Sequence, residues 1–533
     1  MDKISWENLF QENLDFLIKE EIIKRIWSKD YGIWNLNSEF YPDRLGWLDV
    51  LDFIDEKKHY IHNIRNNICN EEFDHIILLG MGGSSLGAEV VYNIITKSEN
   101  KFPNLTVIDT IIPQTIDRIL KKIDLKKSFF IVSSKSGTTL EPLLLYKFFK
   151  DKVKENIGSQ YGSRFMAITD EGTPLADLAL NDNFRYILYN PTNIGGRYSA
   201  LSFFGLIPPM LCGVNFESML IKAKSINEES KLDDLDRNSS ARLGAFMAAM
   251  IKSGRDKMTL IISEEIKSLG LWIEQLVAES CGKDGVGLIP IYDEPLISPK
   301  EYSDDRFFVY IKIREDKELD SYIKQIEENQ SPLIKLELED EDSLGAEFFR
   351  WEFATALLGA FLNINPFDQP NGQLSKDITS RLLLEGIPHS YNDLPCSFLS
   401  LDQMLNVAKP NSYLAIMAYI DDNSEINETL QLLRKRITKE FGIATTLGYG
   451  PRFLHSTGQL HKGGVNSGLF LQITEKKGLD YSIPGQSYSL KKLVDSQAFG
   501  DRLALSLNAR KVMHIEIDND LSSKLPMARL LQG

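Results

Sequence analysis

Short apolar runs alternate with helix-length segments from His75 onward, and this alternation limits the possible folds more than any other feature. A strand that is buried on both faces reads as a continuous apolar run, and helices usually connect parallel strands. The pattern therefore predicts parallel sheets with helices on both faces. The first runs are His75–Leu79, Leu105–Ile108, Phe129–Val132, Phe165–Ile168 and Tyr186–Tyr189.

The same alternation restarts twice along the chain. Because 533 residues exceed what one hydrophobic core supports, we expect several units. The predicted fold class is α/β. It comprises an aromatic-rich helical segment at 1–72 packed on the unit that follows, doubly wound units at 73–225 and 226–408, and an α/β extension at 409–533. The later strands are predicted at Met258–Ile262, Phe307–Ile313, Leu333–Leu338, Tyr413–Tyr419, Leu469–Ile473 and Val512–Ile517, and the helices among them at Ile266–Cys281, Ala346–Leu362, Ile426–Phe441 and Leu490–Leu507.

Charge, the absence of targeting patterns and cysteine usage indicate which partners and which cellular location to expect. A net charge of −15 argues against a nucleic-acid partner, because binding to a phosphate backbone normally needs a basic face. The N-terminus lacks a signal-peptide pattern, and no apolar stretch reaches the ~20 residues of a membrane span. We therefore expect a soluble cytoplasmic protein without a metal. Its scattered cysteines read as reduced thiols, and they are Cys69, Cys212, Cys281 and Cys396.

The first run is followed directly by a glycine-rich loop, Gly80–Gly87, that opens a predicted helix. Glycines let the backbone approach a ligand, and the free amides of a helix N-terminus favour an anion. Ser84 and Ser85 can bind phosphate or cap the helix, and a plain glycine turn is the alternative. A dinucleotide fingerprint would use Asp109 as the ribose-binding acid, but Ser85 replaces the third glycine of that pattern.

A second loop, Ser133–Thr139, follows the third run and is rich in hydroxyls. Its sequence, Ser-Ser-Lys-Ser-Gly-Thr-Thr, suits a phosphate dianion at a helix N-terminus. A solvated, hydroxyl-capped turn is the alternative. Two such loops at the carboxyl ends of strands in one sheet converge on a single crevice, so we predict a phosphate site there.

Both loops resemble the phosphate-binding loops of the sugar isomerase domain, a doubly wound unit. Two more segments resemble the signatures of glucose-6-phosphate isomerases. These are Asn193–Ser199, which reads Asn-Ile-Gly-Gly-Arg-Tyr-Ser, and Phe367-Asp368-Gln369 followed by Lys376. The resemblance implies two sugar isomerase domains and reversible isomerisation of glucose 6-phosphate and fructose 6-phosphate. It also implies that no cofactor or metal takes part and that the protein is a homodimer.

The resemblance assigns roles to individual residues. Glu279, near the end of a helix that stops at Gly282, resembles the general base that moves a proton between C2 and C1 through a cis-enediol. Arg197 would stabilise the enediolate, with a surface ion pair as its alternative. Glu274 is the alternative acid on the same helix. The residues that would hold the substrate phosphate are Gly83, Ser84, Ser134, Lys135, Ser136, Thr139 and Gln369.

Ring opening is assigned to Lys376 and to a histidine in an unexpected place. The family's histidine normally lies between the glutamate and the Phe-Asp-Gln segment, where this sequence has none. The later segment Leu454–Gly464 holds two candidates, and we favour His455 over His461; a loop that only closes the site is the other alternative. The C-terminal third resembles the isomerase portion of fused transaldolase–glucose-6-phosphate isomerase proteins, so we expect the extension to contribute an active-site loop.

Other functions stay open at this point. A phosphosugar-binding regulator would keep both hydroxyl loops but would not need Glu279, Arg197 and Lys376 together. Another isomerase, acting on a mannose phosphate or on several substrates, would differ only in the shape of its pocket. A nicotinamide-dependent oxidoreductase would show a thermal shift with its cofactor. The sequence alone fixes neither the oligomeric state nor the physiological direction.

Overall fold

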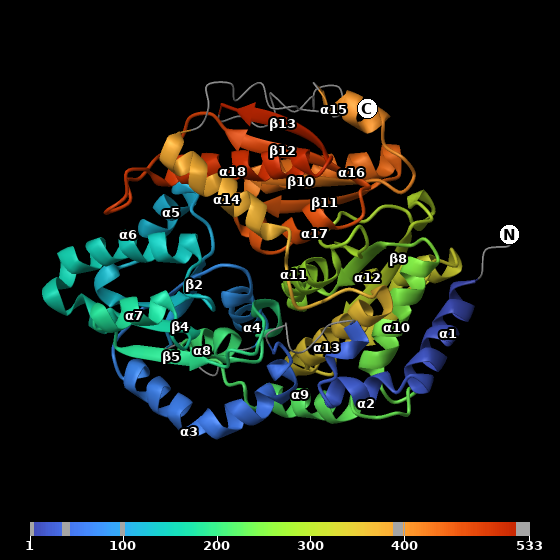
Figure 1. The fold of residues 1–533 in the computed structure, drawn as a ribbon, viewed down its shortest axis with the longest axis horizontal. Helices are drawn as coiled ribbons and strands as arrows, with labels where there is room; N and C mark the ends of the chain where they lie inside the picture. Colours follow the sequence, from blue (N-terminus) through green and yellow to red (C-terminus); the bar gives the residue numbers. More distant parts are fainter. Residues whose placement is uncertain (1–4, 35–42, 96–101, 387–397, 399, 519–533) are drawn as a thin grey trace.

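The computed structural model describes residues 5–34, 43–95, 102–386, 398 and 400–518. Its strands form three sheets, and the strand pairs within them are parallel. Figure 1 shows the first sheet at the left, the second at the right and the third at the top. The predicted α/β class with parallel sheets is confirmed.

The first sheet has five strands in the order β2-β1-β3-β4-β5, so the order reverses between β1 and β3. Alternate residues of β1 face different cores, with Ile76 on one side and Ile77 on the other. Helices α4 and α8 cover the first face, and α5, α6 and α7 cover the second. The elements are β1 His75–Gly80, β2 Asn104–Ile108, β3 Ser128–Ser133, β4 Phe165–Asp170, β5 Tyr186–Asn190, α4 Leu86–Ile94, α5 Pro113–Leu120, α6 Leu140–Ile157, α7 Pro174–Asn181 and α8 Phe203–Leu211, with 3-10 turns η3 Gly82–Ser84 and η6 Gly196–Tyr198.

The second sheet has four strands in the order β7-β6-β8-β9. The predicted helix from Ile266 begins later, at Leu269, because a separate 3-10 turn precedes it. Strand β7 was not predicted, because its three residues include Pro290 and are too few to form a recognisable run. The elements are α9 Glu217–Glu229, α10 Ser239–Lys252, β6 Lys257–Ile262, α11 Leu269–Cys281, β7 Ile289–Ile291, β8 Arg306–Lys312, α12 Lys317–Glu328, β9 Leu333–Glu337 and α13 Leu344–Leu362.

The third sheet has four strands in the order β11-β10-β12-β13. Helices α15 and α16 cover one face, and α18 covers the other. Strand β11 was not predicted, because its sequence Ala-Thr-Thr-Leu-Gly-Tyr carries threonines and a glycine in place of an apolar run. The elements are α14 Gly372–Glu385, α15 Leu401–Asn406, β10 Tyr413–Tyr419, α16 Ser424–Phe441, β11 Ala444–Tyr449, η11 Arg452–His455, α17 Gly458–Gly463, β12 Gly468–Glu475, α18 Leu490–Leu507 and β13 Lys511–Ile517.

The N-terminal helical segment packs on two units. The ring of Trp6 meets that of Phe246 in α10 at 5.7 Å, and the indole Nε1 of Trp34 donates to the carbonyl of Ala356 in α13 at 2.9 Å. The later part of the segment packs on the first unit, where α3 contacts α8 and the ring of Trp47 meets that of Tyr198 at 5.4 Å. The expectation that the segment packs on the unit following it is therefore wrong for its first part. The helices are α1 Trp6–Lys19, α2 Ile22–Trp27 and α3 Val50–Cys69.

Two large apolar cores connect the sheets. One extends from the first sheet through α8 and α13 to the second sheet. The other extends from the opposite face of the first sheet to the third, where Tyr413, Phe470 and Val512 join it. Each core therefore crosses a boundary between sheets.

The carboxyl ends of the third sheet's strands meet the first unit. After β10, Asp421 accepts from the hydroxyl of Thr115 at 2.7 Å, and Asp422 accepts from Arg118 at 2.6 Å. Glu475, which ends β12, accepts from Gln114. The three donors all belong to α5, so this helix covers that edge of the third sheet.

Two findings relate to the predictions of reduced cysteines and of a chain without a membrane span. Among the described residues, Cys69, Cys212 and Cys281 form no disulfide, and Cys396 lies outside the described residues. No helix in the described ranges is long and apolar enough to cross a membrane. The cytoplasmic location stays a prediction.

Candidate active site

The two predicted phosphate loops lie together at the carboxyl edge of the first sheet. One follows β1 and the other follows β3, the strands between which the order reverses. Doubly wound sheets bind ligands at this reversal. The hydroxyl of Ser133 donates to the carbonyl of Ser84 at 2.6 Å and joins the loops.

Glycines in the first loop let three segments of the chain meet. A Cβ on Gly82, whose φ is +54°, would lie 2.7 Å from the carbonyl oxygen of His455. A Cβ on Gly83 would lie 2.1 Å from the carbonyl oxygen of Gly196. A larger residue at either position would displace the loop that carries His455 or the loop that carries Arg197.

The hydroxyls of the second loop bind one another around Gly137, which has a φ of +63°. Ser134 donates to Thr139 at 3.0 Å, and the hydroxyls of Ser136 and Thr138 lie 2.9 Å apart. Ser134 is fully buried, whereas Ser136 is exposed. Helix α6 begins directly after the loop, so these hydroxyls surround its N-terminus.

Lys135 is fixed within the second loop. Its ammonium pairs with the carboxylate of Asp170 and donates to the carbonyl of Thr192 at 3.0 Å. Burial lowers the pKa of Lys135 and raises the pKa of Asp170, although the ion pair opposes both shifts. The cation is thus held in place by protein groups.

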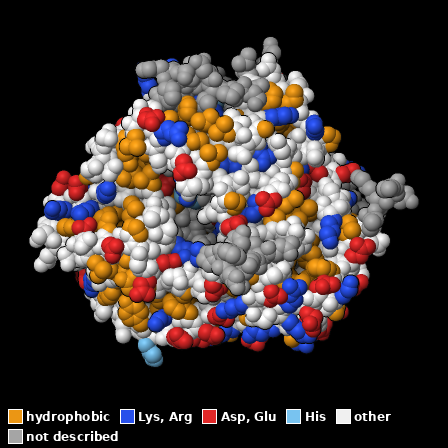
Figure 2. Space-filling model, viewed as in Figure 1, with side chains coloured by type: hydrophobic (Ala, Val, Ile, Leu, Met, Phe, Trp, Pro, Cys, Tyr) orange, Lys and Arg blue, Asp and Glu red, His pale blue; other side chains and the backbone are white. Residues whose placement is uncertain are grey.

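A cavity of about 610 Å³ opens beside this loop. Four of the predicted residues line it: Lys135, Ser136, Arg197 and Gln369. This volume is typical of a small-molecule site. Figure 2 shows the same view of the molecule hollowed near its middle, with basic and acidic side chains at the edge of the hollow.

Arg197 is 5% exposed and is held by several contacts. Its Nε donates to the hydroxyl of Ser280 at 2.7 Å. Its Nη2 donates to the carbonyls of Pro366 and Asp368 at 2.7 and 2.8 Å. Its Nη1 lies 3.5 Å from Oε1 of Glu279. Burial thus excludes the alternative of a surface ion pair.

Glu279 lies one turn from the end of α11, a helix that is buried on nearly every side. The residue is 6% exposed, and its Oε2 accepts from Nε2 of Gln275 at 3.2 Å. Gln275 also donates to the carbonyl of His455 at 2.9 Å. Glu279 is therefore linked to Arg197 on one side and to the His455 loop on the other.

His455 reaches across from the third unit to the first. Its Nε2 lies 3.0 Å from Oε1 of Glu141 in the first turn of α6, and Gln497 donates to the same oxygen at 2.7 Å. Burial by itself would raise the pKa of Glu141. Attraction to His455 and the hydrogen bonds from its neighbours outweigh burial and hold this pKa at about 2. The imidazole therefore faces an ionised carboxylate.

Two other predicted candidates lie apart from these residues. His461 is 3% exposed, its ring packs against Phe453 and Phe470 at 5.9 and 5.2 Å, and burial lowers its pKa to about 3. Lys376 is exposed on α14, because the buried face of that helix, which includes Ser375, packs on α18. The structure does not bring Lys376 to the wall of the cavity.

Sequence reasoning missed three residues of the site. Glu141 and Gln275 contact His455, and their partner lies far away in the chain. Lys283 donates to the carbonyls of Asn365 and Asp368 at 2.7 and 2.5 Å, and burial lowers its pKa to about 8. The one sequence signal for Lys283 is its position, four residues after Glu279.

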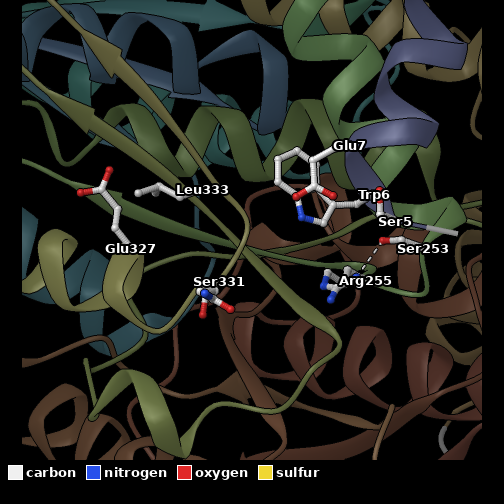
Figure 3. A pocket seen from close by; sticks show the side chains of 9 residues that line it. Ser5, Trp6, Glu7, Ser253, Arg255, Glu327, Ser331 and Leu333 are labelled. Carbon is white, nitrogen blue, oxygen red and sulfur yellow. Dashed lines mark hydrogen bonds between the residues drawn. The ribbon is translucent and has the colours of Figure 1, made fainter. Parts of the chain in front are cut away.

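A second hollow, of about 750 Å³, lies elsewhere on the surface (Figure 3). Its wall includes Trp6 of α1, Arg255 before β6 and Leu333 of β9. The contact drawn between its side chains joins Arg255 to Ser253 at 3.1 Å. None of the predicted site residues lines this hollow, so the cavity at the first sheet remains the candidate site.

Comparison with known proteins shows which proteins this chain resembles. The family model described as phosphoglucose isomerase matches residues 48–287, which include both phosphate loops, Arg197 and Glu279. Glucose-6-phosphate isomerase from Staphylococcus aureus (strain NCTC 8325 / PS 47) is 29% identical over 411 residues, covering 68% of this chain and 91% of the relative. The enzyme from strain Newman is similar to the same extent.

Two solved structures share the fold. A hypothetical protein from Thermus thermophilus, TT0462, has a TM-score of 0.60 at 22% identity, covering 71% of this chain and 98% of that chain. A glucose-6-phosphate isomerase from Chlamydia trachomatis D/UW-3/Cx has a TM-score of 0.58 at 17% identity, covering 72% and 88%. The family model, the sequence relatives and the fold agree, so the chain is similar to proteins of the phosphoglucose isomerase family.

Proposed function

We propose that the protein interconverts glucose 6-phosphate and fructose 6-phosphate, with Glu279 as the base. Its similarity to the phosphoglucose isomerase family model and to relatives named glucose-6-phosphate isomerase supports an aldose–ketose isomerase. One observation carries the assignment of the base. Arg197 lines the cavity, and the buried carboxylate of Glu279 lies 3.5 Å from its guanidinium.

The proton transfer needs one base and one cation. Glu279 takes the proton from C2 of the open-chain aldose and returns it to C1, through a cis-enediol. The negative charge that develops on the substrate oxygens is stabilised by Arg197, whose other nitrogens are already held by Ser280 and two carbonyls. A guanidinium fixed in this way needs little reorganisation during the reaction.

Ring opening falls to His455 in this mechanism. Its imidazole moves a proton between the ring oxygen and the anomeric hydroxyl. Glu141 orients the ring through the 3.0 Å contact. The exposed position of Lys376 gives no support to its predicted role in this step, so the proposal uses the histidine alone.

The substrate phosphate binds at the N-terminus of α6. Hydroxyls and amides of the second loop face this position, and the positive end of the helix dipole favours a dianion. Lys135 adds a positive charge that its Asp170 partner holds in place. The proposed phosphate ligands are Gly83, Ser84, Ser134, Lys135, Ser136, Thr139 and Gln369.

The test compares two glutamates of the same helix. Glu279→Gln should lower the conversion of fructose 6-phosphate by roughly a hundredfold or more, because a positioned base contributes about that much. It should still bind a sugar-phosphate inhibitor. The rate is read through a coupled dehydrogenase with EDTA present, and exchange of the C2 hydrogen of glucose 6-phosphate with solvent deuterium should fall in parallel.

Glu274→Gln is the matched control. Burial raises the pKa of Glu274 to about 8, so it is mostly protonated at pH 7 and an amide resembles it closely. Its turnover should stay within about threefold of wild type. Retention of more than about a tenth of wild-type turnover by Glu279→Gln would exclude Glu279 as the base. A wild-type protein that binds sugar phosphates tightly without turnover would instead be a regulator.

Several expectations stay predictions. A substrate range that includes a mannose phosphate depends on the shape of the pocket. The homodimer and the four-segment division at 1–72, 73–225, 226–408 and 409–533 are likewise proposals. Size-exclusion chromatography with light scattering tests the homodimer directly, because it measures the mass of the assembly.

A further inference from the structure

Arg452 precedes His455 by three residues in the turn η11, and its guanidinium crosses to the first unit. Its Nε lies 2.7 Å from Oδ2 of Asp109, the residue after β2, and its Nη2 lies 2.5 Å from Oε2 of Glu89 in the first turn of α4. The Arg452 side chain is 28% exposed, and those of Asp109 and Glu89 are 13% and 24% exposed. These ion pairs are thus partly shielded from solvent.

The geometry of η11 couples Arg452 to His455. A 3-10 helix has three residues per turn, so side chains three apart lie on the same side. The amide of Leu454 donates to the carbonyl of Pro451 at 2.9 Å, which closes this turn. Arg452 contacts the end of β2 and the start of α4, while His455 contacts Glu141 at the start of α6. The turn is therefore attached to the first unit at two points.

The other side of η11 is attached to the third unit. Phe453 is 2% exposed, and its ring meets that of Tyr419 at 5.3 Å and that of His461 at 5.9 Å. The end of the turn also contacts the second unit, because the carbonyl of His455 accepts from Gln275 of α11 at 2.9 Å. With Phe453 fixed in the core of the third unit, the contacts of Arg452 and His455 hold the turn against the first unit, and those of Arg452 do not involve the imidazole itself.

We propose that Arg452, bound to Asp109 and Glu89, is a positioning residue that sets the orientation of His455 in the active site. This inference rests on the proposed role of His455 in ring opening. Asp109 thereby gains a function that differs from the ribose-binding role weighed for it from the sequence. Without the guanidinium, two carboxylates would face each other and the turn would lose its first attachment point.

An error of about 1 Å in the placement of a catalytic group can cost roughly a hundredfold in rate. Arg452→Met keeps much of the side-chain volume and removes the charge. It should lower kcat for fructose 6-phosphate by about 10- to 100-fold, with a much smaller change in KM. Most of the proposed phosphate ligands lie in the second loop, to which Arg452 is not paired, so KM should change little.

A double-mutant cycle separates positioning from general stabilisation. If Arg452 acts through His455, adding Arg452→Met to His455→Ala should lower kcat by less than about threefold further. If Arg452 only stabilises the contact between units, both backgrounds should lose the same factor. Equal losses would overturn the inference.

Arg118→Met is the matched control variant. Arg118 also pairs across the contact between the first and third units, with Asp421 at 3.2 Å and Asp422 at 2.6 Å, but it does not hold η11. Its removal should leave kcat within about threefold of wild type. The imidazole NMR signals of His455, assigned by their loss in His455→Ala, should shift in Arg452→Met and not in Arg118→Met. Unshifted signals in Arg452→Met would also contradict the inference.

Asp109→Asn provides a second variant in case Arg452→Met does not fold. It removes one of the two charge partners and nearly preserves shape, so we expect a smaller loss of kcat with the same dependence on His455. Additive losses in Asp109→Asn and His455→Ala would overturn the inference. An inactive wild-type protein would overturn the proposed function itself, whereas an active wild type with additive losses would overturn only the role of Arg452.

Discussion

Glu141 is a carboxylate that stays ionised inside the protein because its neighbours stabilise the charge. It is 3% exposed and has a pKa of about 2, against an ordinary value of 4.5. His455 and Gln497 both contact its Oε1. The charge therefore depends on contacts that exist only in the folded protein.

Glu141 should make folding sensitive to acid. Its pKa is lower in the folded protein, so its contribution is complete above the unfolded pKa of 4.5 and is lost as the pH falls through about 2. The depressed pKa corresponds to about 3 kcal/mol. Between pH 5.5 and pH 2.5, the free energy of unfolding of wild type should fall more than that of Glu141→Gln, as measured by denaturant unfolding.

Glu155→Gln is the control for this measurement, because Glu155 is an exposed acid on the same helix. It should follow the wild-type dependence on pH. The expectation fails if Glu141→Gln loses as much stability in acid as wild type does.

At the scale of elements, the end of α11 and the short helix α17 approach each other at a glycine. A Cβ on Gly282 would lie 2.5 Å from Cα of Leu460, and the carbonyl of Gly282 accepts from Gln459 at 2.9 Å. Glu279 lies one turn earlier on α11. The close packing of these two helices thus bears directly on where the carboxylate sits.

Gly282→Ala should force α17 away from α11. We expect a loss of about 1–3 kcal/mol in the free energy of unfolding, which is typical of overpacking, together with a lower kcat. Gly372→Ala at the start of α14 is the control, because a Cβ there meets nothing within 4 Å. Thermal unfolding and the isomerase assay measure both effects. Equal stability of the two variants would contradict the packing argument.

The elements that the sequence predicts well are those with a strong pattern over enough residues. Helix α18 was predicted with its observed bounds, Leu490–Leu507, and β10 with its bounds, Tyr413–Tyr419. Strand β7 is too short to give a recognisable pattern, and the threonines of β11 make a partly buried strand look polar in sequence. Sheet order was not predictable in detail, since it depends on contacts between segments far apart in the chain.

The same limit applies to the candidate site. The glycine and hydroxyl loops are contiguous in sequence, so their chemistry is visible there. Glu141 and Gln275 are single polar residues in helices, and nothing local connects them to His455. Lys376 shows a different limit, since a segment that resembles a family signature places its lysine on the exposed face of α14.

At the scale of the whole molecule, the core shared by the first and third sheets should make them unfold together. Phe130 of β3 and Phe470 of β12 belong to the same apolar cluster. Fluorescence and far-UV circular dichroism can test this, because none of the 6 tryptophans follows Trp351. Tryptophan emission therefore reports the first and second units, whereas circular dichroism reports all three.

We expect the two signals to change at the same denaturant concentration. Phe130→Leu and Phe470→Leu should both lower that concentration for both signals, because each removes packing from the one core. A loss of helical signal that precedes the change in fluorescence would mean that the third unit unfolds independently.

The third sheet's carboxyl edge differs from that of the first in what covers it. Helix α5 lies over it, and Asp421, Asp422 and Glu475 bind side chains of that helix. A doubly wound unit normally binds its ligand at this edge. Because α5 occupies the edge in the third unit, contacts with α5, and not with a ligand, restrict its residues. Over evolutionary time, most loops of the third unit can drift as long as the contact with α5 survives. The segment 450–457 is the exception under the proposed mechanism, because its sequence must preserve the placement of His455 as well as the fold.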